Sequence, residues 1–307
     1  MAKNFWQKLK RPILALAPMA GVSDSAFRQL CAENGAQVLY SEMASAAALF
    51  YNPQETLELL KFNAKKERPY VVQLFGSAPE HFAAAAQIVT KKIKPDGIDI
   101  NFGCPVKKVT KTGAGAALMQ DLKKSRAVIE AVLANTNLPV SIKIRTHSGK
   151  ISAVNFLKNI SDLKITALMI HGRTLNQGFS GAIDYDIVKK ARPYFSGIIL
   201  LNGGINKHED IAMTLKKSGA DGVGIARGAY GNPWIFKGDK PDVKIIFKTA
   251  IKHAALMQKL KGAAGILEMR KHLCWYVNSF AGAAALRAEL VKVETLAQIK
   301  KILKYKN

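Results

Sequence analysis

The segment "GIDINFGCPVKKV" (97–109) joins a short apolar alternation to a turn in which one cysteine stands between glycine and proline, followed by two lysines. The alternation predicts a β-strand over residues 97–103. Cys104 therefore follows directly after the end of a strand. In parallel α/β proteins such loops carry functional residues.

Seven further stretches of this character lie on either side of the segment. Helical patterns separate them, for example over 79–93, 125–136 and 208–219, the last of which ends in a glycine suited to a helix C-cap. Alternating strands and helices predict a parallel sheet, and eight such units in about 230 residues are typical of a closed (β/α)8 barrel, the TIM barrel. The other seven predicted strands cover 13–19, 37–42, 70–76, 140–145, 167–173, 197–204 and 222–228.

A doubly wound open sheet is the alternative α/β architecture. It is less favoured because the first predicted strand runs into "APMAGVSD" (17–24), which contains no GxGxxG motif opening a helix.

A change of pattern follows "GNPWIFKGDKPD" (231–242), where strand patterns stop and helical patterns continue to the end of the chain. We therefore expect a barrel domain over residues 1–239 and a smaller all-helical domain over 240–307. The second part contains 14 Lys or Arg and 4 Asp or Glu, a net charge of +10. Its surface is either the solvated face of a helical bundle that caps the barrel or a docking surface for RNA.

Helical spacing within that part predicts which residues face its core. Four apolar residues recur at helical intervals and should be buried, which leaves Arg270, Lys271 and His272 mostly on the other faces. The four core-facing residues are Met269, Leu273, Tyr276 and Phe280.

Composition sets the remaining limits. The chain has 307 residues, of which 49% are hydrophobic, and it shows neither a signal-peptide core nor an apolar run of membrane-spanning length. We expect a cytoplasmic protein without a membrane segment, and a monomer. Cys31, Cys104 and Cys274 are odd in number and lack CxxC spacing, so neither a disulfide framework nor a zinc site is indicated. The formal charge of +24 favours polyanionic partners, although lysine-rich surfaces alone also produce it.

Polar or unusual side chains stand at the carboxyl ends of the predicted strands. These ends meet at one face of a barrel, where active sites form, so the pattern predicts a single site there. The side chains are Met19, Glu42, Gln73, Asn101, Cys104, Lys143, Arg145, His171, Asn202 and Arg227.

Two of these ends indicate a phosphorylated cofactor. "NGGI" (202–205) and "ARGAYG" (226–231) follow the seventh and eighth strands, whose loops often bind phosphate in such barrels. Lys143 points into the barrel by strand alternation and needs an anion there, such as a reduced flavin. Gln73 offers an amide to a flavin ring edge. A metal at His171 is not expected, because no second ligand lies at suitable spacing.

The Cys104 thiol has two chemical uses. Its ordinary pKa of about 8.5 leaves it protonated at neutral pH, so it can act as a general acid. As a nucleophile it would need a base, for which His171 is the candidate at this end of the barrel. Cys31 and Cys274 we interpret as small buried hydrophobes.

Two long motifs, "DINFGCPVKKVTKTGAGAALM" (99–119) and "MRKHLCWYVNSFAGAAALR" (269–287), resemble the tRNA-dihydrouridine synthases, most closely their bacterial B-type branch. The resemblance runs from "LALAPMAGVSD" (14–24) to "AALRAELVKVET" (284–295).

This resemblance implies an FMN-dependent TIM barrel with a helical tRNA-binding domain, which uses NADPH to reduce uridine in tRNA to 5,6-dihydrouridine. Hydride would pass from FMN N5 to uracil C6, and Cys104 would give the proton to C5. The family often has glycine at position 226 and an acidic residue at 204, where this chain has alanine and glycine. The implied cofactor-binding residues are Pro18, Met19, Ala20, Gln73, Lys143 and His171, with Asn202, Gly203, Gly204, Ala226 and Arg227 at the phosphate.

For the substrate, the resemblance implies that Asn101 orients the uracil and that a uridine flipped out of its stack reaches the barrel mouth. Basic residues would meet the RNA. They are Lys107, Lys108, Lys111, Arg145, Arg270, Lys271, His272 and Arg287.

Two other functions remain open from the sequence. An FMN oxidoreductase of a free pyrimidine, similar to dihydroorotate or dihydropyrimidine dehydrogenases, shares the Asn-x-x-Cys-Pro turn, but it has no use for a basic helical part. An RNA-binding protein that has lost flavin chemistry is disfavoured by the presence of Gln73, Cys104, Lys143 and Asn202.

Overall fold

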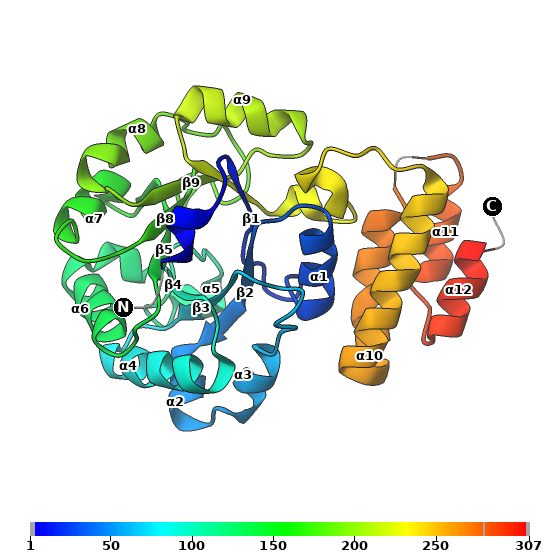
Figure 1. The fold of residues 1–307 in the computed structure, drawn as a ribbon, viewed down its shortest axis with the longest axis horizontal. Coiled ribbons are helices and arrows are strands. Elements are labelled where there is room, and N and C mark those ends of the chain that lie inside the picture. The colour runs from blue at the N-terminus through cyan, green and yellow to red at the C-terminus, as the bar shows by residue number, and fades with distance from the viewer. Residues whose placement is uncertain (1–3, 279, 305–307) are drawn as a thin grey trace.

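A computed structural model describes residues 4–278 and 280–304 and shows a closed barrel of eight parallel strands (Figure 1). Neighbouring strands follow the order β1-β10-β9-β8-β5-β4-β3-β2. The TIM barrel and all eight predicted strands are confirmed. The strands are β1 (Ile13–Leu16), β2 (Val38–Ser45), β3 (Tyr70–Phe75), β4 (Gly97–Asn101), β5 (Val140–Arg145), β8 (Ala167–His171), β9 (Ile198–Asn202) and β10 (Gly222–Ile225).

Helices surround the barrel because the outward side chains of the strands, such as Val72, Ile98 and Ile142, are apolar and pack against them. Gly219 ends the last barrel helix in the left-handed conformation that its C-cap pattern predicts. The barrel helices are α1 (Ser25–Glu33), α2 (Ala46–Tyr51), α3 (Gln54–Leu59), α4 (Pro79–Ile88), α5 (Lys107–Thr110), α6 (Leu122–Ala134), α7 (Ala153–Asn159), α8 (Ile187–Ala191) and α9 (Glu209–Ser218).

The amino end of the barrel is filled with apolar side chains. A single turn of 3-10 helix (Phe5–Lys8) puts Trp6 there, buried in one cluster with Ala15, Tyr40 and Met169. This packing closes the interior of the barrel at its amino end. A small hairpin, β6 (His147–Ser148) with β7 (Ile151–Ser152), follows β5 and was not predicted, because two residues per strand are too few to show a period.

The chain then continues into the predicted helical part, α10 (Val243–Tyr276), α11 (Ala283–Leu290) and α12 (Leu296–Lys304), which lies to one side of the barrel (Figure 1). Within α10, Gly262 has φ 61° and ψ −141°, which reverses the chain. Gly265 then packs directly on the backbone of Met257. α10 is therefore a helical hairpin, whose arms 243–261 and 263–276 pack against each other. Residues 1–3 and 305–307, at the ends of the two predicted domains, lie outside the described residues.

The buried side of the second arm is wider than predicted. Met269, Leu273 and Tyr276 are buried as expected, and Phe280 is partly buried. His272, however, was expected on the surface and is fully buried against Phe27 of α1 and His253 of the first arm. The surface placement of His272 is wrong because the arm is covered on two sides, by its own bundle and by the barrel.

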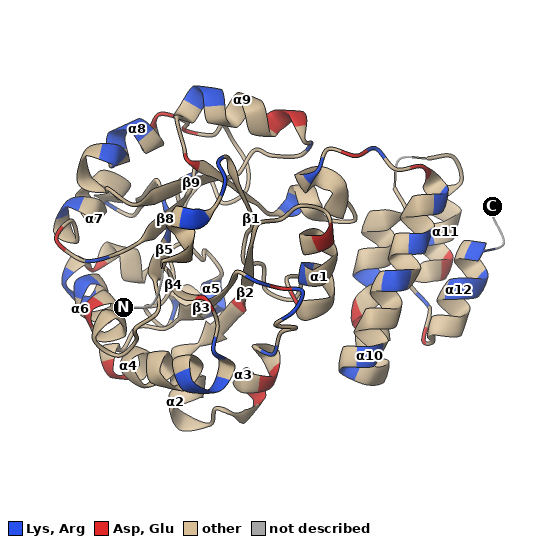
Figure 2. Ribbon diagram, in the orientation of Figure 1, with Lys and Arg blue, Asp and Glu red and all other residues tan. Residues whose placement is uncertain are grey.

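The basic charge is widely distributed. Lys and Arg lie on the outer faces of barrel helices and of the α10–α12 helices alike (Figure 2). None of the described helices is both long and apolar enough to span a membrane.

A buried ion pair holds α1 against the barrel. Arg28 and Glu67 are both inaccessible to solvent, and the guanidinium lies 2.7 Å from the carboxylate and 2.7 Å from the Ser23 carbonyl oxygen. Arg28→Met leaves the carboxylate unpaired and should lower the free energy of unfolding by about 3–5 kcal/mol. Urea denaturation followed by circular dichroism measures this loss.

The control is Lys189→Met, which removes a cation from an exposed ion pair with Asp186 on the surface. Exposed pairs contribute little, so this variant should unfold close to the wild type. Equal losses in the two variants would contradict the stabilising role of the buried pair.

Candidate active site at the carboxyl end of the barrel

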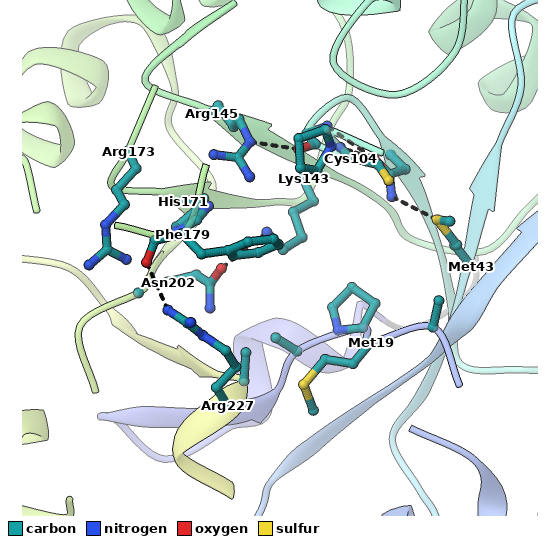
Figure 3. Close-up of a pocket in the computed structure, with 18 of the residues that line it drawn as sticks. Met19, Met43, Cys104, Lys143, Arg145, His171, Arg173, Phe179, Asn202 and Arg227 are labelled. Atoms are coloured by element: carbon teal, nitrogen blue, oxygen red, sulfur yellow. Dashed lines mark hydrogen bonds between the residues drawn. The ribbon is translucent and has the colours of Figure 1, made fainter. Parts of the chain in front are cut away.

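One cavity of about 360 Å³ opens at the carboxyl ends of the strands (Figure 3). Most of the residues singled out from the sequence line it, although they come from seven strands spread over more than 200 residues. They are Pro18, Met19, Ala20, Gln73, Asn101, Cys104, Lys143, Arg145, His171, Asn202, Gly203, Gly204, Ala226 and Arg227.

The remaining predicted substrate residues lie outside the cavity. Lys107, Lys108 and Lys111 are exposed on and just after α5, immediately beyond the cysteine turn. The Lys271 ammonium lies over Gly21, next to the cavity wall.

Three of the residues predicted to contact RNA also interact within the protein. Arg270 donates to the carbonyl oxygen of Val293 at 2.8 Å, and Arg287 donates to that of Val277 at 3.0 Å. His272 is enclosed in the core, which is incompatible with the predicted contact to RNA in this structure.

The turn that carries Cys104 is fixed by hydrogen bonds. The Asn101 side-chain oxygen accepts from the backbone N–H groups of Gly103 at 3.0 Å and Cys104 at 2.9 Å. Ala116 N–H donates to the Cys104 carbonyl oxygen at 3.0 Å. Gly115 has φ +61° and approaches that same oxygen so closely that a Cβ would lie 2.9 Å from it. The thiol is thereby held at the rim of the cavity.

A chain of side-chain hydrogen bonds supports the turn from inside the barrel. Asn101 donates to Gln73 at 2.9 Å, Gln73 donates to Asp99 at 2.8 Å, and Ser141 donates to the other Asp99 oxygen at 2.6 Å. Burial raises the Asp99 pKa to about 6. The role of Asp99 was missed in the sequence, where the available signal was a carboxylate inside an otherwise apolar strand.

The other wall of the cavity is cationic. Lys143 donates to the Asn202 side-chain oxygen at 3.1 Å, and burial together with the nearby Arg145 lowers the Lys143 pKa to about 8. Burial, and then Lys143, lowers the His171 pKa to about 2, so this imidazole is neutral at physiological pH.

Two arginines hold the loop between β8 and α8 by its backbone. Arg145 donates to the carbonyl oxygens of Thr174 and Gly178, and Arg227 donates to that of Phe179, each at 2.9 Å. The Phe179 ring lies within 5.8 Å of Arg145 and 5.2 Å of Arg227 and extends across the cavity (Figure 3).

Several cavity residues were not predicted, among them Met43, Arg173, Phe179 and Tyr230. The position of Arg173, two residues after His171 at a strand end, was an available signal. Phe179 lies in a glycine-containing loop without a period, and nothing in the sequence indicates its inward position.

The donor set of the cavity fits an anionic planar cofactor. Within residues 4–278 and 280–304, no carboxylate lies at ion-pair distance from Lys143, Arg145, Arg173 or Arg227. Gly203 and Gly204 have φ +108° and +75°, which lets their loop turn tightly beside these cations. Uncompensated cations beside such a loop indicate a site for a phosphate group.

The surroundings of the Cys104 thiol favour its protonated form. Burial raises the Cys104 pKa, and the Val106 N–H, Arg145 and Lys143 oppose this only in part. In the described part of the chain, no hydrogen bond joins the thiol to His171 or to another base. Its geometry therefore favours proton donation.

Comparison with known proteins finds the same family along nearly the whole chain. The family profile "Dihydrouridine synthase (Dus)" matches residues 15–306. "Probable tRNA-dihydrouridine synthase 1" of Synechocystis sp. is 34% identical over 94% of this chain and 84% of its own length. "tRNA-dihydrouridine synthase B" of Xanthomonas axonopodis pv. citri is 33% identical over 92% of this chain and 89% of its own.

Solved structures with the same barrel are far more distant in sequence. A 2-naphthoyl-CoA reductase complex matches with a TM-score of 0.57 at 11% identity, over 77% of this chain and 52% of that chain. Morphinone reductase matches with a TM-score of 0.52 at 14% identity, over 76% and 88%. These two likenesses support the fold only.

The raised pKa of Cys104 can be tested directly. The alkylation rate of Cys104 by iodoacetamide should rise with pH around a midpoint above that of an unstructured cysteine peptide, because only the thiolate reacts. Peptide mass spectrometry of the Cys274→Ala variant, which lacks the other half-buried thiol, measures the rate at each pH. A midpoint below that of the peptide would identify an activated thiolate and contradict the acid role.

Proposed function

The chain belongs to the dihydrouridine synthase family, and from this premise we propose that it reduces uridine in tRNA to 5,6-dihydrouridine with FMN as its flavin and NADPH as its reductant. Family membership assigns the reaction class: the protein is a flavin-dependent oxidoreductase that forms dihydrouridine in tRNA. The observation that carries the proposal is the Cys104 thiol, held by its turn at the rim of a cavity whose cations have no carboxylate at ion-pair distance among the described residues.

FMN would lie with its ring among Pro18, Met19, Ala20, Gln73 and Lys143, and with its phosphate at the two glycine-containing loops. The phosphate residues are Asn202, Gly203, Gly204, Ala226 and Arg227. When bound, FMN supplies the hydride for uracil C6. Lys143, with its pKa lowered to about 8, would provide a positive charge to the ring, and His171, with its pKa lowered to about 2, would face the cofactor as a neutral imidazole.

Cys104 completes the reduction by donating a proton to uracil C5. The thiol must be neutral for this step, and its partial burial, which raises its pKa, favours that form. Asn101 is already engaged through its oxygen with the turn and through its nitrogen with Gln73, so it positions Cys104 as well as facing the base. Arg145 donates hydrogen bonds both to the Gly103 carbonyl oxygen and to the neighbouring loop, which holds the two walls of the cavity in fixed relative positions.

The substrate tRNA would meet the basic residues around the mouth. A uridine inside folded RNA must leave its stack to enter a cavity of this depth. Lys107, Lys108 and Lys111 beside the cysteine turn, and Lys271 on α10, would contact the displaced backbone. We propose that residues 240–307 form the tRNA-binding domain, and that the enzyme acts as a cytoplasmic monomer.

Reduction of a free pyrimidine is less favoured. Nothing in that reaction requires a basic helical hairpin at the rim of the cavity, whereas a polyanionic substrate does.

The proton-donor role predicts a selective defect. Cys104→Ala should retain FMN and oxidise NADPH at nearly the wild-type rate, while uridine reduction slows by about 10²–10⁴-fold, because only the acid is removed. Flavin absorbance, NADPH consumption without tRNA, and dihydrouridine formation in single-turnover reactions measure the three steps separately.

Cys274→Ala is the matched control, since Cys274 lies on α10 outside the cavity, and it should behave as the wild type in all three assays. An equal loss of NADPH oxidation and uridine reduction in Cys104→Ala would count against the donor role.

A further inference from the structure

A stacked pair of aromatic rings joins the cavity wall to the helical hairpin. The rings of Tyr230 and Trp275 are nearly parallel, with an interplanar angle of 12° and centroids 4.0 Å apart. Tyr230 lines the cavity, and Trp275 lies in the second arm of α10. The pair is thus a direct contact between the barrel mouth and the helical part, which Figure 1 shows side by side.

Tyr230 lies near the end of a tight loop, 226–231, which contains two of the proposed phosphate-binding residues, Ala226 and Arg227. Ala229 N–H donates to the Ala226 carbonyl oxygen at 2.9 Å, and Tyr230 N–H donates to that of Arg227 at 3.0 Å. Ala226 itself has φ −114° and ψ −105°, outside the regions of regular structure.

The contact between the loop and α10 also involves the backbone of the residue that follows Tyr230. Gly231 has φ +61°, and a Cβ there would lie 2.3 Å from the Trp275 carbonyl group. Loop and helix therefore touch main chain to main chain, which only glycine permits at this position. A movement of this arm of α10 relative to the barrel would have to move the loop.

Contacts within the helical hairpin also fix the position of the Trp275 ring. Its ring meets His272 edge-on at 4.9 Å, and His272 meets His253 of the first arm at 4.7 Å. Both histidines are fully buried. The position of the indole is therefore set by the core of the hairpin and not by solvent-exposed contacts.

We propose that Trp275 is a positioning residue that acts through Tyr230 to hold the loop 226–231 in the conformation that binds the cofactor phosphate. This proposal rests on the proposed function, because it assigns the phosphate of FMN to that loop. It also makes the helical hairpin, which presents Lys271 at the cavity rim, part of the cofactor site.

The test compares FMN with riboflavin, which lacks the phosphate. Trp275→Leu should weaken FMN binding to the apoprotein by about two- to tenfold, the effect typical of one aromatic pair, and leave riboflavin binding unchanged. Trp275→Phe, which keeps a ring against Tyr230, should restore most of the FMN affinity. Titration of flavin fluorescence measures both ligands.

Tyr276→Leu is the matched control, because Tyr276 is the next residue on the same arm, is buried, and packs on His253 and Trp234 instead of Tyr230. It should lower the melting temperature without changing the ratio of FMN to riboflavin affinity. Tyr230→Leu should reproduce the effect of Trp275→Leu, and the double variant should bind FMN no more weakly than either single variant.

If the wild type binds FMN but Trp275→Leu and Tyr230→Leu leave the ratio of FMN to riboflavin affinity unchanged, this proposal is overturned and the proposed function is not. An equal loss of FMN and riboflavin affinity, or the same ratio change in Tyr276→Leu, would also overturn it by showing a merely structural role. A wild-type protein that binds neither flavin would overturn the proposed function, and this inference with it.

Discussion

Closure of the parallel barrel is the constraint on which the site depends. Eight parallel strands that close on one another must place all their carboxyl ends on one rim, so residues distant in the chain become neighbours. Gln73, Lys143 and Asn202 meet in one cavity for this reason. The apolar packing around Trp6 at the other end makes the barrel a solid scaffold on which these side chains keep their relative positions.

The electrostatics of the cavity reflect function more than stability. Lys143 and three arginines gather there without a carboxylate at ion-pair distance among the described residues, an arrangement that costs folding free energy until an anion arrives. The same burial keeps the Cys104 thiol protonated and His171 neutral. Asp99, Gln73 and Asn101 form a hydrogen-bonded support that connects the barrel interior to the cysteine turn. The site thus combines a cationic cavity with a thiol in fixed position.

The strands could be predicted because their apolar periods are strong and each ends in a polar residue or glycine, and the cavity residues followed from barrel geometry. The features of the structure that could not be predicted depend on contacts between segments that are distant in the chain. The burial of His272 follows from the packing of an arm between two partners, and a helical period can show only one apolar face. The reversal at Gly262 looks in sequence like any glycine in a helix, and Phe179 reaches the cavity through a loop held by Arg145 and Arg227. The hydrogen bonds that Arg270 and Arg287 donate to backbone carbonyl oxygens also depend on tertiary contacts that a helical period does not show.

The most direct test of the account is mass spectrometry of unmodified tRNA incubated with the purified protein, FMN and NADPH, beside parallel reactions with free uracil and orotate. The account predicts a gain of two hydrogens on uridine in tRNA, mapped by nuclease digestion to defined positions, and no change in the free pyrimidines. Reduction of a free pyrimidine with tRNA left unmodified would contradict it and would reduce the basic hairpin to a solvated surface.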